Sequence, residues 1–199
     1  MIAKPHKIGL LGGSFNPAHD GHVHVSRLAL QRLGLDQVWW LVAPQNPLKS
    51  TTDMAPLAIR MATAERTAAH EPRIRVSALE VELKTRYTVD TLTALQSRFP
   101  DHLFVWIIGA DNLCQIPRWE GWKDIFRRVP IAVFPRAPYS LRALNGRAAR
   151  RFATARVPAT KALQLIHMPP PAWVFLRAPL HGQSATRIRR QRDLSRTRH

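Results

Sequence analysis

Short apolar runs alternate with segments of helical periodicity along the first two thirds of the chain. The run KIGLLGG at 7–13 is apolar almost throughout, which is typical of a strand buried on both faces. In the next segment, 20–35, apolar residues recur three and four positions apart, which predicts a helix. Asp20 suits the N-cap of this helix, and Gly34 suits its C-terminal end.

The same alternation continues to residue 134. Further strands are predicted at 37–43, 74–80, 102–110 and 131–134. Further helices are predicted at 56–70, 88–99 and 122–129. Strands and helices that alternate in this way form parallel sheets with helices on both faces. We therefore expect an α/β fold with a Rossmann-like, doubly wound parallel sheet, built as a single domain from residues 1–199.

The pattern is weaker in the last third of the chain. The arginine-rich stretch 136–160 has room for a short basic helix, but its periodicity does not locate one. Late strands are predicted at 162–167 and 172–176, separated by a proline turn. A final helix is predicted to begin at Ser184 or Thr186, ahead of a basic tail.

Three connections are expected at the ligand-binding edge of this sheet. In doubly wound sheets, ligands bind beyond the carboxyl ends of the strands, where the strand order reverses. The turn at 12–22, the loop at 43–50 and the turn at 109–112 each follow a predicted strand. We therefore expect these three segments to converge on one crevice.

The net charge of the chain is large, but it does not by itself identify a function. Thirty Lys and Arg residues against 13 Asp and Glu give a formal net charge of +17, and no acidic residue lies between Asp124 and Asp193. Such a surface attracts nucleotides, RNA or DNA. A solvated arginine-rich face has the same composition, so charge alone does not decide between a ligand and no ligand.

The remaining composition excludes several classes of protein. No apolar run approaches the ~18 residues that a membrane helix needs, and the N-terminus has no signal-peptide pattern. The lone cysteine, Cys114, excludes an internal disulfide framework and suits a reducing cytoplasm. We expect a packing role for it, because nothing nearby in the sequence resembles an activating base.

The stretch GGSFNPAHDGH at 12–22 is the first candidate for chemistry. It matches neither GxxxxGK[ST] nor GxGxxG, yet its glycines allow close backbone approach and the following helix begins with unpaired N–H donors. His19 and His22 are best suited to binding phosphate at this position. A zinc site would need a third ligand, for which His24 is the local candidate, but the three rings do not share a helical face well. Unrelated surface histidines are the other alternative.

This stretch resembles the GGSFDPxHxGH motif of the bacterial nicotinate-nucleotide adenylyltransferases, which are members of the HxGH nucleotidyltransferase superfamily. Asn16 stands where that motif commonly has aspartate. Four further segments resemble family motifs in the same order, so the resemblance covers nearly the whole chain. They are APQNPLK (43–49), YTVDTL (87–92), IIGADNLCQIPRWEGWKDI (107–125) and SATRIR (184–189).

The resemblance implies transfer of the adenylyl group of ATP to nicotinate mononucleotide, which gives nicotinate adenine dinucleotide and pyrophosphate. It also implies that Mg²⁺ enters with ATP. Simple chemistry agrees with this reaction, because the attacking phosphate is already anionic and needs neither an enzyme nucleophile nor a strong base. The protein has to align the reacting groups and neutralise the charge on the phosphate oxygens.

The resemblance also assigns roles at the ATP site. His19 and His22 hold the phosphates and stabilise the transition state, and Arg189 shares this catalytic role as part of a triphosphate clamp. Asp111 bonds the nucleotide ribose, although capping of the helix that follows is a second role for the same side chain. The other residues assigned to ATP are Gly13, Ser14, Phe15, Gly109, Ser184 and Thr186.

At the mononucleotide site, Asn46 and Lys49 are the candidates for the phosphate, and Trp119 is the candidate for stacking on the pyridine ring. Backbone N–H groups around Thr88 and Glu120 are expected near the ring carboxylate, with the Glu120 side chain facing solvent. The other tryptophans are expected in the core, at Trp39, Trp40, Trp106, Trp122 and Trp173.

Two rival functions remain. Phosphopantetheine adenylyltransferases share the HxGH element, but they have shorter chains and do not account for the segment RWEGW at 118–122. A basic module that binds RNA or DNA would explain the charge but none of the ordered motifs. We therefore expect no nucleic-acid or membrane partner. The sequence leaves the oligomeric state open, a homo-oligomer included.

Overall fold

A parallel sheet forms the centre of the protein. The computed structural model describes residues 6–44, 54–136 and 138–177. In these ranges the sheet has seven strands in the order β3-β2-β1-β4-β5-β7-β6, and every strand pair is parallel. The strands are β1 (Lys7–Gly13), β2 (Gln37–Val42), β3 (Ile74–Ser77), β4 (Leu103–Gly109), β5 (Ile131–Phe134), β6 (Arg156–Val157) and β7 (Trp173–Phe175). This confirms the predicted doubly wound parallel sheet.

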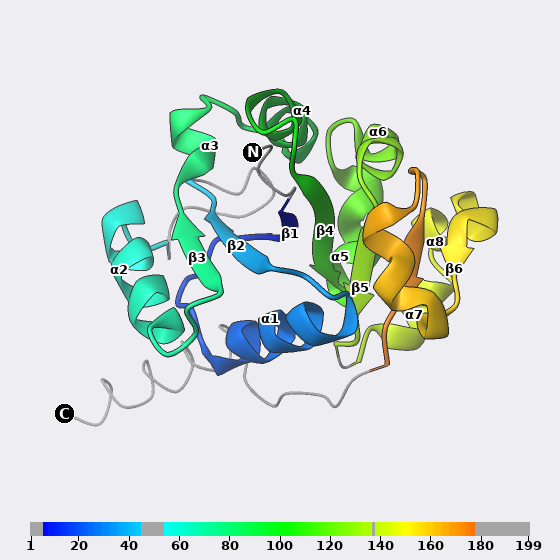
Figure 1. Ribbon diagram of the computed structural model, residues 1–199, viewed down its shortest axis with the longest axis horizontal. Helices are drawn as coiled ribbons and strands as arrows, with labels where there is room; N and C mark the ends of the chain where they lie inside the picture. Colours follow the sequence, from blue (N-terminus) through cyan, green and yellow to red (C-terminus); the bar gives the residue numbers. More distant parts are fainter. Residues whose placement is uncertain (1–5, 45–53, 137, 178–199) are drawn as a thin grey trace, which may run out of the picture.

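Helices cover both faces of the sheet (Figure 1). Helices α1 and α2 and the 3-10 helix η3 pack on one face, and α3 to α8 pack on the other. The helices are α1 (Asp20–Arg32), α2 (Leu57–Ala68), α3 (Leu79–Glu82), α4 (Thr88–Arg98), α5 (Ala110–Gln115), η1 (Ile116–Arg118), α6 (Trp122–Arg128), α7 (Ser140–Leu144), α8 (Arg147–Arg151), η2 (Ala153–Ala155) and η3 (Ala159–His167). None of these is long and apolar enough to cross a membrane.

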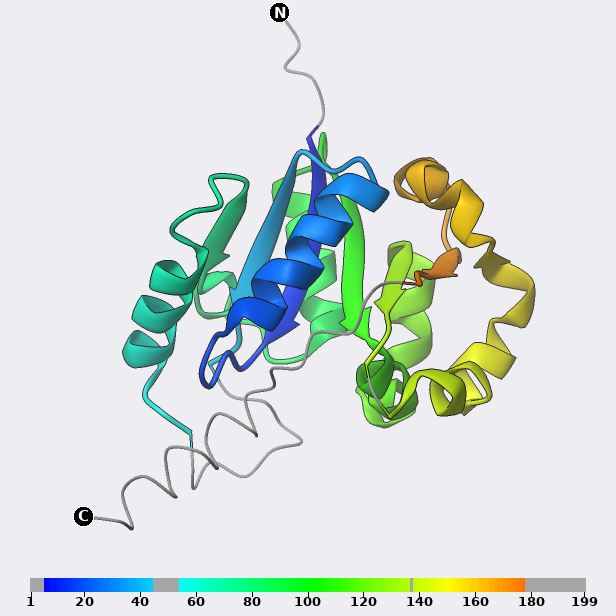
Figure 2. The ribbon, with the colours of Figure 1, turned by 90° about the horizontal axis from the view of Figure 1, so that it is seen from below.

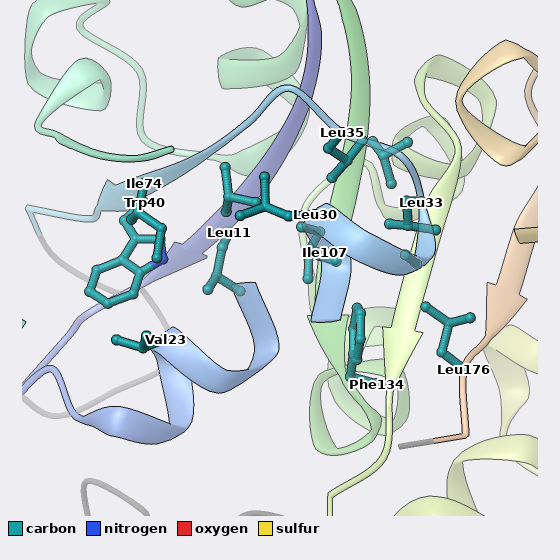
Figure 3. Close-up of a cluster of buried hydrophobic side chains, with 14 of the residues drawn as sticks. Leu11, Val23, Leu30, Leu33, Leu35, Trp40, Ile74, Ile107, Phe134 and Leu176 are labelled. Atoms are coloured by element: carbon teal, nitrogen blue, oxygen red, sulfur yellow. The ribbon is translucent and has the colours of Figure 1, made fainter. Parts of the chain in front are cut away.

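Two apolar cores fill the space between the sheet and its helices. Side chains of a strand alternate between the faces, so Leu10 lies in one core and Leu11 in the other. Figure 3 shows Leu30 of α1 and the C-cap residue Leu33 on the same side of the sheet as Ile107 of β4. Burial of both faces explains why the central strands are apolar almost throughout. Figure 2 shows α1 lying across the central strands, with α7, α8 and η3 gathered beyond β5.

Most predicted elements up to residue 134 are confirmed within one or two residues. The predicted strand at 74–80 is too long, because β3 ends at Ser77 and the chain then turns into α3. The predicted turn at 109–112 is wrong as well, since α5 begins directly after β4.

The last third departs further from prediction. The predicted strand at 162–167 belongs to η3, because Ala162, Leu165 and Ile166 are buried while Leu163 is 62% exposed. Burial at spacings of three and four places the apolar side chains on one face of a helix. The predicted strand at 172–176 is confirmed as β7, and the arginine-rich stretch contains α7, α8 and β6. The predicted final helix lies outside the described residues.

Candidate active site

The site lies where the strand order of the sheet reverses, between β1 and β4. The chain runs from β1 to β2 on one side, whereas β4 pairs with β1 on the other. Leu11 pairs with Ile107, so Gly13 and Gly109 end neighbouring strands at the same edge. Ala43, which follows β2, donates its backbone N–H to Gly13 O at 2.9 Å. The three strand ends therefore lie at one edge of the sheet, as predicted, while residues 45–50 of the predicted loop lie outside the described residues.

The turn after β1 is built around a buried aromatic ring. Phe15 is 2% exposed and has a φ of 46°. Its ring stacks on Trp40 of β2, with centroids 5.0 Å apart, and contacts the ring of His22 at 4.8 Å. Trp40 is itself fixed to α1, because its indole N–H donates to Ser26 Oγ at 2.8 Å. The aromatic stack therefore holds the turn and the start of α1 together.

The two glycines at the start of this turn, Gly12 and Gly13, differ in the space around them. A Cβ at Gly12 would lie 2.7 Å from Trp106 Cη2, so packing beneath the turn requires glycine there. A Cβ at Gly13 would meet only the ring of Phe15, at 3.5 Å, which is an ordinary contact. The contacts around Gly13 therefore do not themselves require glycine at this position.

His19 and His22 cap α1 reciprocally. His19 is the N-cap residue, and its Nδ1 accepts a hydrogen bond from Gly21 N–H at 3.1 Å. His22 stands at the third helical position, and its Nδ1 accepts from His19 N–H at 3.2 Å. This is a capping box made of two imidazoles, whose ring centroids lie 3.9 Å apart. The predicted N-cap, Asp20, is wrong: it is the first helical residue and is exposed.

The cap determines the tautomer of each ring in its neutral form. A neutral imidazole that accepts through Nδ1 carries its proton on Nε2. Each ring is therefore a donor through Nε2–H, at the N-terminus of a 13-residue helix whose dipole favours anions. This arrangement is suited to binding phosphate. Among the described residues, no group of three or more His, Cys, Asp or Glu side chains is arranged to hold a metal ion.

Asp111 and Arg136 meet across the ends of β4 and β5. Arg136 Nη1 donates to Asp111 Oδ2 at 3.1 Å, and Asp111 Oδ1 is buried with no protein partner in the described ranges. A Cβ at Gly109 would overlap Oδ1, so the carboxylate lies directly over this glycine. Gly109 is the N-cap residue of α5, and no side chain makes a capping hydrogen bond to this helix start. The alternative role of Asp111 as a helix cap is therefore wrong.

The start of α4 lies against the segment before α6. Gly121 has a φ of 57°, and a Cβ there would lie 3.0 Å from Val89 Cγ1. This contact joins the start of α4, where Thr88 is the first residue, to the segment that also contains Trp119 and Glu120. Trp119 is half-buried against the second core, and Glu120 is exposed as expected.

Other predicted residues fall into two groups. Four of the tryptophans expected in the core, Trp39, Trp40, Trp106 and Trp173, are buried, while Trp122 is half-buried against the second core. Cys114 also packs there, and burial raises the pKa of its thiol, which agrees with a packing role. The predicted residues outside the described ranges are Asn46, Lys49, Ser184, Thr186 and Arg189.

The sequence reading missed Arg60, which is 2% exposed beneath the turn. Its guanidinium donates to the backbone carbonyls of Ser14, Ala43, Pro44 and Ala55. A signal was available, because Arg60 occupies a position in the apolar stripe of its helix, where a charge is unusual.

Comparison with known proteins agrees with this geometry. Residues 10–191 match the cytidylyltransferase-like family. A relative from Parvibaculum lavamentivorans named "Probable nicotinate-nucleotide adenylyltransferase" is 56% identical over 183 residues, which cover 92% of this chain and 90% of the relative. A relative of the same name from Cereibacter sphaeroides is 51% identical over 92% of this chain and 95% of its own length. The Plasmodium falciparum nicotinic acid mononucleotide adenylyltransferase complexed with NaAD has the same fold, with a TM-score of 0.70, 16% identity, and coverage of 93% of this chain and 83% of that one.

Proposed function

The chain belongs to the nicotinate-nucleotide adenylyltransferase family, and from this membership we propose that it transfers the adenylyl group of ATP to nicotinate mononucleotide. The products are nicotinate adenine dinucleotide (deamido-NAD) and pyrophosphate, so the reaction is a step of NAD biosynthesis. A phosphate oxygen of the mononucleotide forms a bond to the α-phosphorus of ATP. The bond from that phosphorus to the β-phosphate bridging oxygen breaks, and pyrophosphate leaves with the electron pair. No proton has to be removed from the attacking group.

The reciprocal cap of His19 and His22 is the observation that carries this proposal. It orients two Nε2–H donors at a helix N-terminus, beside the point where the strand order reverses. Donors that are held in place before the substrate arrives stabilise the negative charge that develops on phosphate oxygens in the transition state. Gly13, Ser14 and Phe15 precede these histidines in the same turn and supply backbone groups to ATP.

The rest of the ATP site follows from the neighbouring strand end. Asp111, whose Oδ1 has no protein partner in the described ranges, accepts hydrogen bonds from the ribose hydroxyls. Gly109 leaves room for this carboxylate, because it has no side chain. Ser184, Thr186 and Arg189, which lie outside the described ranges, complete the clamp on the triphosphate.

The mononucleotide is bound on the other side of the reacting phosphate. Trp119 stacks on the pyridine ring, and Thr88 lies near the ring carboxylate. Support comes from the contact between Gly121 and Val89, which joins the two segments that carry these residues. Asn46 and Lys49, outside the described ranges, bind the phosphate of the mononucleotide.

Nucleotidyltransferases generally use a divalent metal ion, and we propose Mg²⁺ here. The ligands of this ion would be mainly the ATP phosphates and water. When bound, Mg²⁺ neutralises charge on the phosphates. The protein residues then orient the two substrates.

We also propose the following for the chain as a whole. Residues 1–199 act as a single nucleotidyltransferase domain, with the SATRIR motif and a basic tail at the C-terminal end. The reaction takes place in the cytoplasm, whose reducing conditions suit a chain with one cysteine. No nucleic acid is required, and a homo-oligomer is compatible with the site.

The direct test is an activity assay on the purified full chain. The protein is incubated with ATP, Mg²⁺ and nicotinate mononucleotide, and the dinucleotide and pyrophosphate are quantified separately. We expect equal amounts of both products. If ATP is neither bound nor consumed while an oligonucleotide binds with a steep salt dependence, the nucleic-acid function replaces this proposal.

A further inference from the structure

Arg60 occupies an unusual place for a charged residue. It lies on the face of α2 that packs against the sheet, with Ala64 and Ala68 one and two turns further along the helix, and both are buried. No salt bridge involves Arg60 within the described ranges. Burial lowers the pKa of the guanidinium, but an arginine stays charged at neutral pH. Burial of a charge is costly unless the charged group is hydrogen-bonded.

Backbone carbonyls take the place of a carboxylate partner. Arg60 Nε donates to Ala55 O at 2.8 Å, and Nη2 donates to Pro44 O at 2.8 Å. Nη1 donates to both Ser14 O and Ala43 O, each at 2.7 Å. The four acceptors come from three segments: the turn after β1, the end of β2 and the approach to α2. One planar side chain therefore joins three segments that are far apart in the sequence.

These segments are part of the candidate active site. Ser14 belongs to the turn that leads to the helix-capping histidines, and Ala55 and Pro44 flank the segment 45–53. Ala55 is held twice, because its N–H also donates to Asn16 Oδ1 at 3.3 Å. Two side chains thus connect the turn after β1 to Ala55. Asn16 accepts from the N–H of Ala55, and Arg60 donates to the carbonyls of Ala55 and Ser14.

We infer that Arg60 is a positioning residue for the proposed adenylyl transfer, a role that rests on that function. Its guanidinium sets the distance between the histidine turn and the two flanks of segment 45–53. A displacement of about 1 Å between groups that hold two reacting substrates lowers the rate by up to ~10²-fold. Lysine cannot replace it, because a single ammonium group cannot reach four carbonyls arranged around a planar fork.

The test compares Arg60→Lys with Arg66→Lys, which alters an exposed arginine of the same helix. Both are assayed at a temperature where circular dichroism shows them fully folded. We expect Arg60→Lys to raise the KM for nicotinate mononucleotide at least ~10-fold and to lower kcat/KM by ~10- to 100-fold. Arg66→Lys should keep the parent values. Parent kcat and KM in folded Arg60→Lys, or a loss that merely follows the unfolded fraction at unchanged KM, would overturn the inference.

A second measurement separates the positioning role from the proposed activity. The amide of Ala43, which donates to Gly13 O, reports whether the turn stays docked on β2. Its hydrogen exchange should be at least ~10-fold faster in Arg60→Lys and unchanged in Arg66→Lys. An inactive parent with this exchange pattern refutes the proposed function alone. If Arg60→Lys does not fold, Arg60→Gln is measured instead, and failure of both variants to fold would assign Arg60 to stability and overturn the inference.

Discussion

His22 accepts the backbone N–H of His19 through Nδ1, at 3.2 Å, so the ring proposed to stabilise the transition state also caps a helix. The two roles use different atoms of one imidazole. Nδ1 caps the helix. Nε2–H is the atom proposed to bind the phosphate. The folding role and the catalytic role can therefore be separated by choosing which atom a substitution keeps.

We expect His22→Asn to lose activity but not stability. The asparagine amide oxygen can occupy the position of Nδ1 and keep the cap, while the Nε2–H donor is lost. Loss of one preorganised donor should lower kcat by roughly 10²- to 10³-fold. Thermal denaturation should remain close to that of the parent.

His22→Ala is the control for the cap. It removes both atoms, so it should lose activity to the same extent and also about 1 kcal/mol of stability. Steady-state kinetics and urea denaturation measure the two effects. If His22→Asn keeps a parent-like kcat, His22 does not stabilise the transition state.

The strands of this fold are predictable because their burial leaves a clear pattern. The predicted strand 131–134 coincides with β5, whose four side chains are all buried. The prediction of a strand at 162–167 is wrong because four of its six residues are apolar, a pattern that suits a strand as well as a helix. Only packing decides between them, and it buries one side of η3.

Residues of the candidate site are predictable from the sequence when they belong to a motif. They are not predictable when their contacts come from segments far apart in the chain. The motif identifies His19 and His22, but histidine is not among the usual N-cap residues, so Asp20 was preferred. Arg60 was missed because its partners are carbonyls from three segments, and no local pattern encodes such a set. The salt bridge of Asp111 with Arg136 likewise depends on which strands are neighbours.

Glu80 should make the stability of the protein depend on pH. This carboxyl is 8% exposed in α3, and burial raises its pKa to about 7 from an ordinary value of 4.5. The folded state then binds the proton more tightly than the unfolded state. Stability is fully present below about pH 4.5 and falls as the pH rises through about 7.

Glu80→Gln removes this dependence because the amide does not ionise. Relative to the parent, the variant should gain up to about 3 kcal/mol between pH 4.5 and pH 8. Urea denaturation across this range measures the difference. The exposed Glu82→Gln in the same helix is the matched control and should follow the parent curve. Parallel curves for Glu80→Gln and the parent would contradict the burial argument.

Arg189 should matter for ATP, whereas the tail beyond it should not. A guanidinium fork can hold two phosphate oxygens together, which a lysine ammonium does not reproduce. We expect Arg189→Lys to raise the KM for ATP and to lower kcat/KM for ATP by at least ~10-fold. Deletion of residues 196–199 should leave both values unchanged. Equal losses in the two variants would mean that the clamp has been assigned to the wrong residue.

The enzyme should prefer nicotinate mononucleotide to the nicotinamide compound. The two substrates differ only by a carboxylate or a carboxamide on the ring, so shape cannot distinguish them. Backbone N–H groups near Thr88 and Glu120 would satisfy both carboxylate oxygens but would face the amide NH₂ with another donor. Glu120 is exposed, and we expect its carboxylate to face solvent and not the ring.

A polar mismatch of this kind discriminates by factors of up to ~10⁴ to 10⁵. We therefore expect kcat/KM at saturating ATP and Mg²⁺ to be at least ~10²-fold higher for the nicotinate compound. Gly121→Ala, which would press on Val89, should narrow this ratio by displacing the two segments that form the pocket. A ratio near one in the parent would reject the assigned ring pocket, while adenylyl transfer itself would stand.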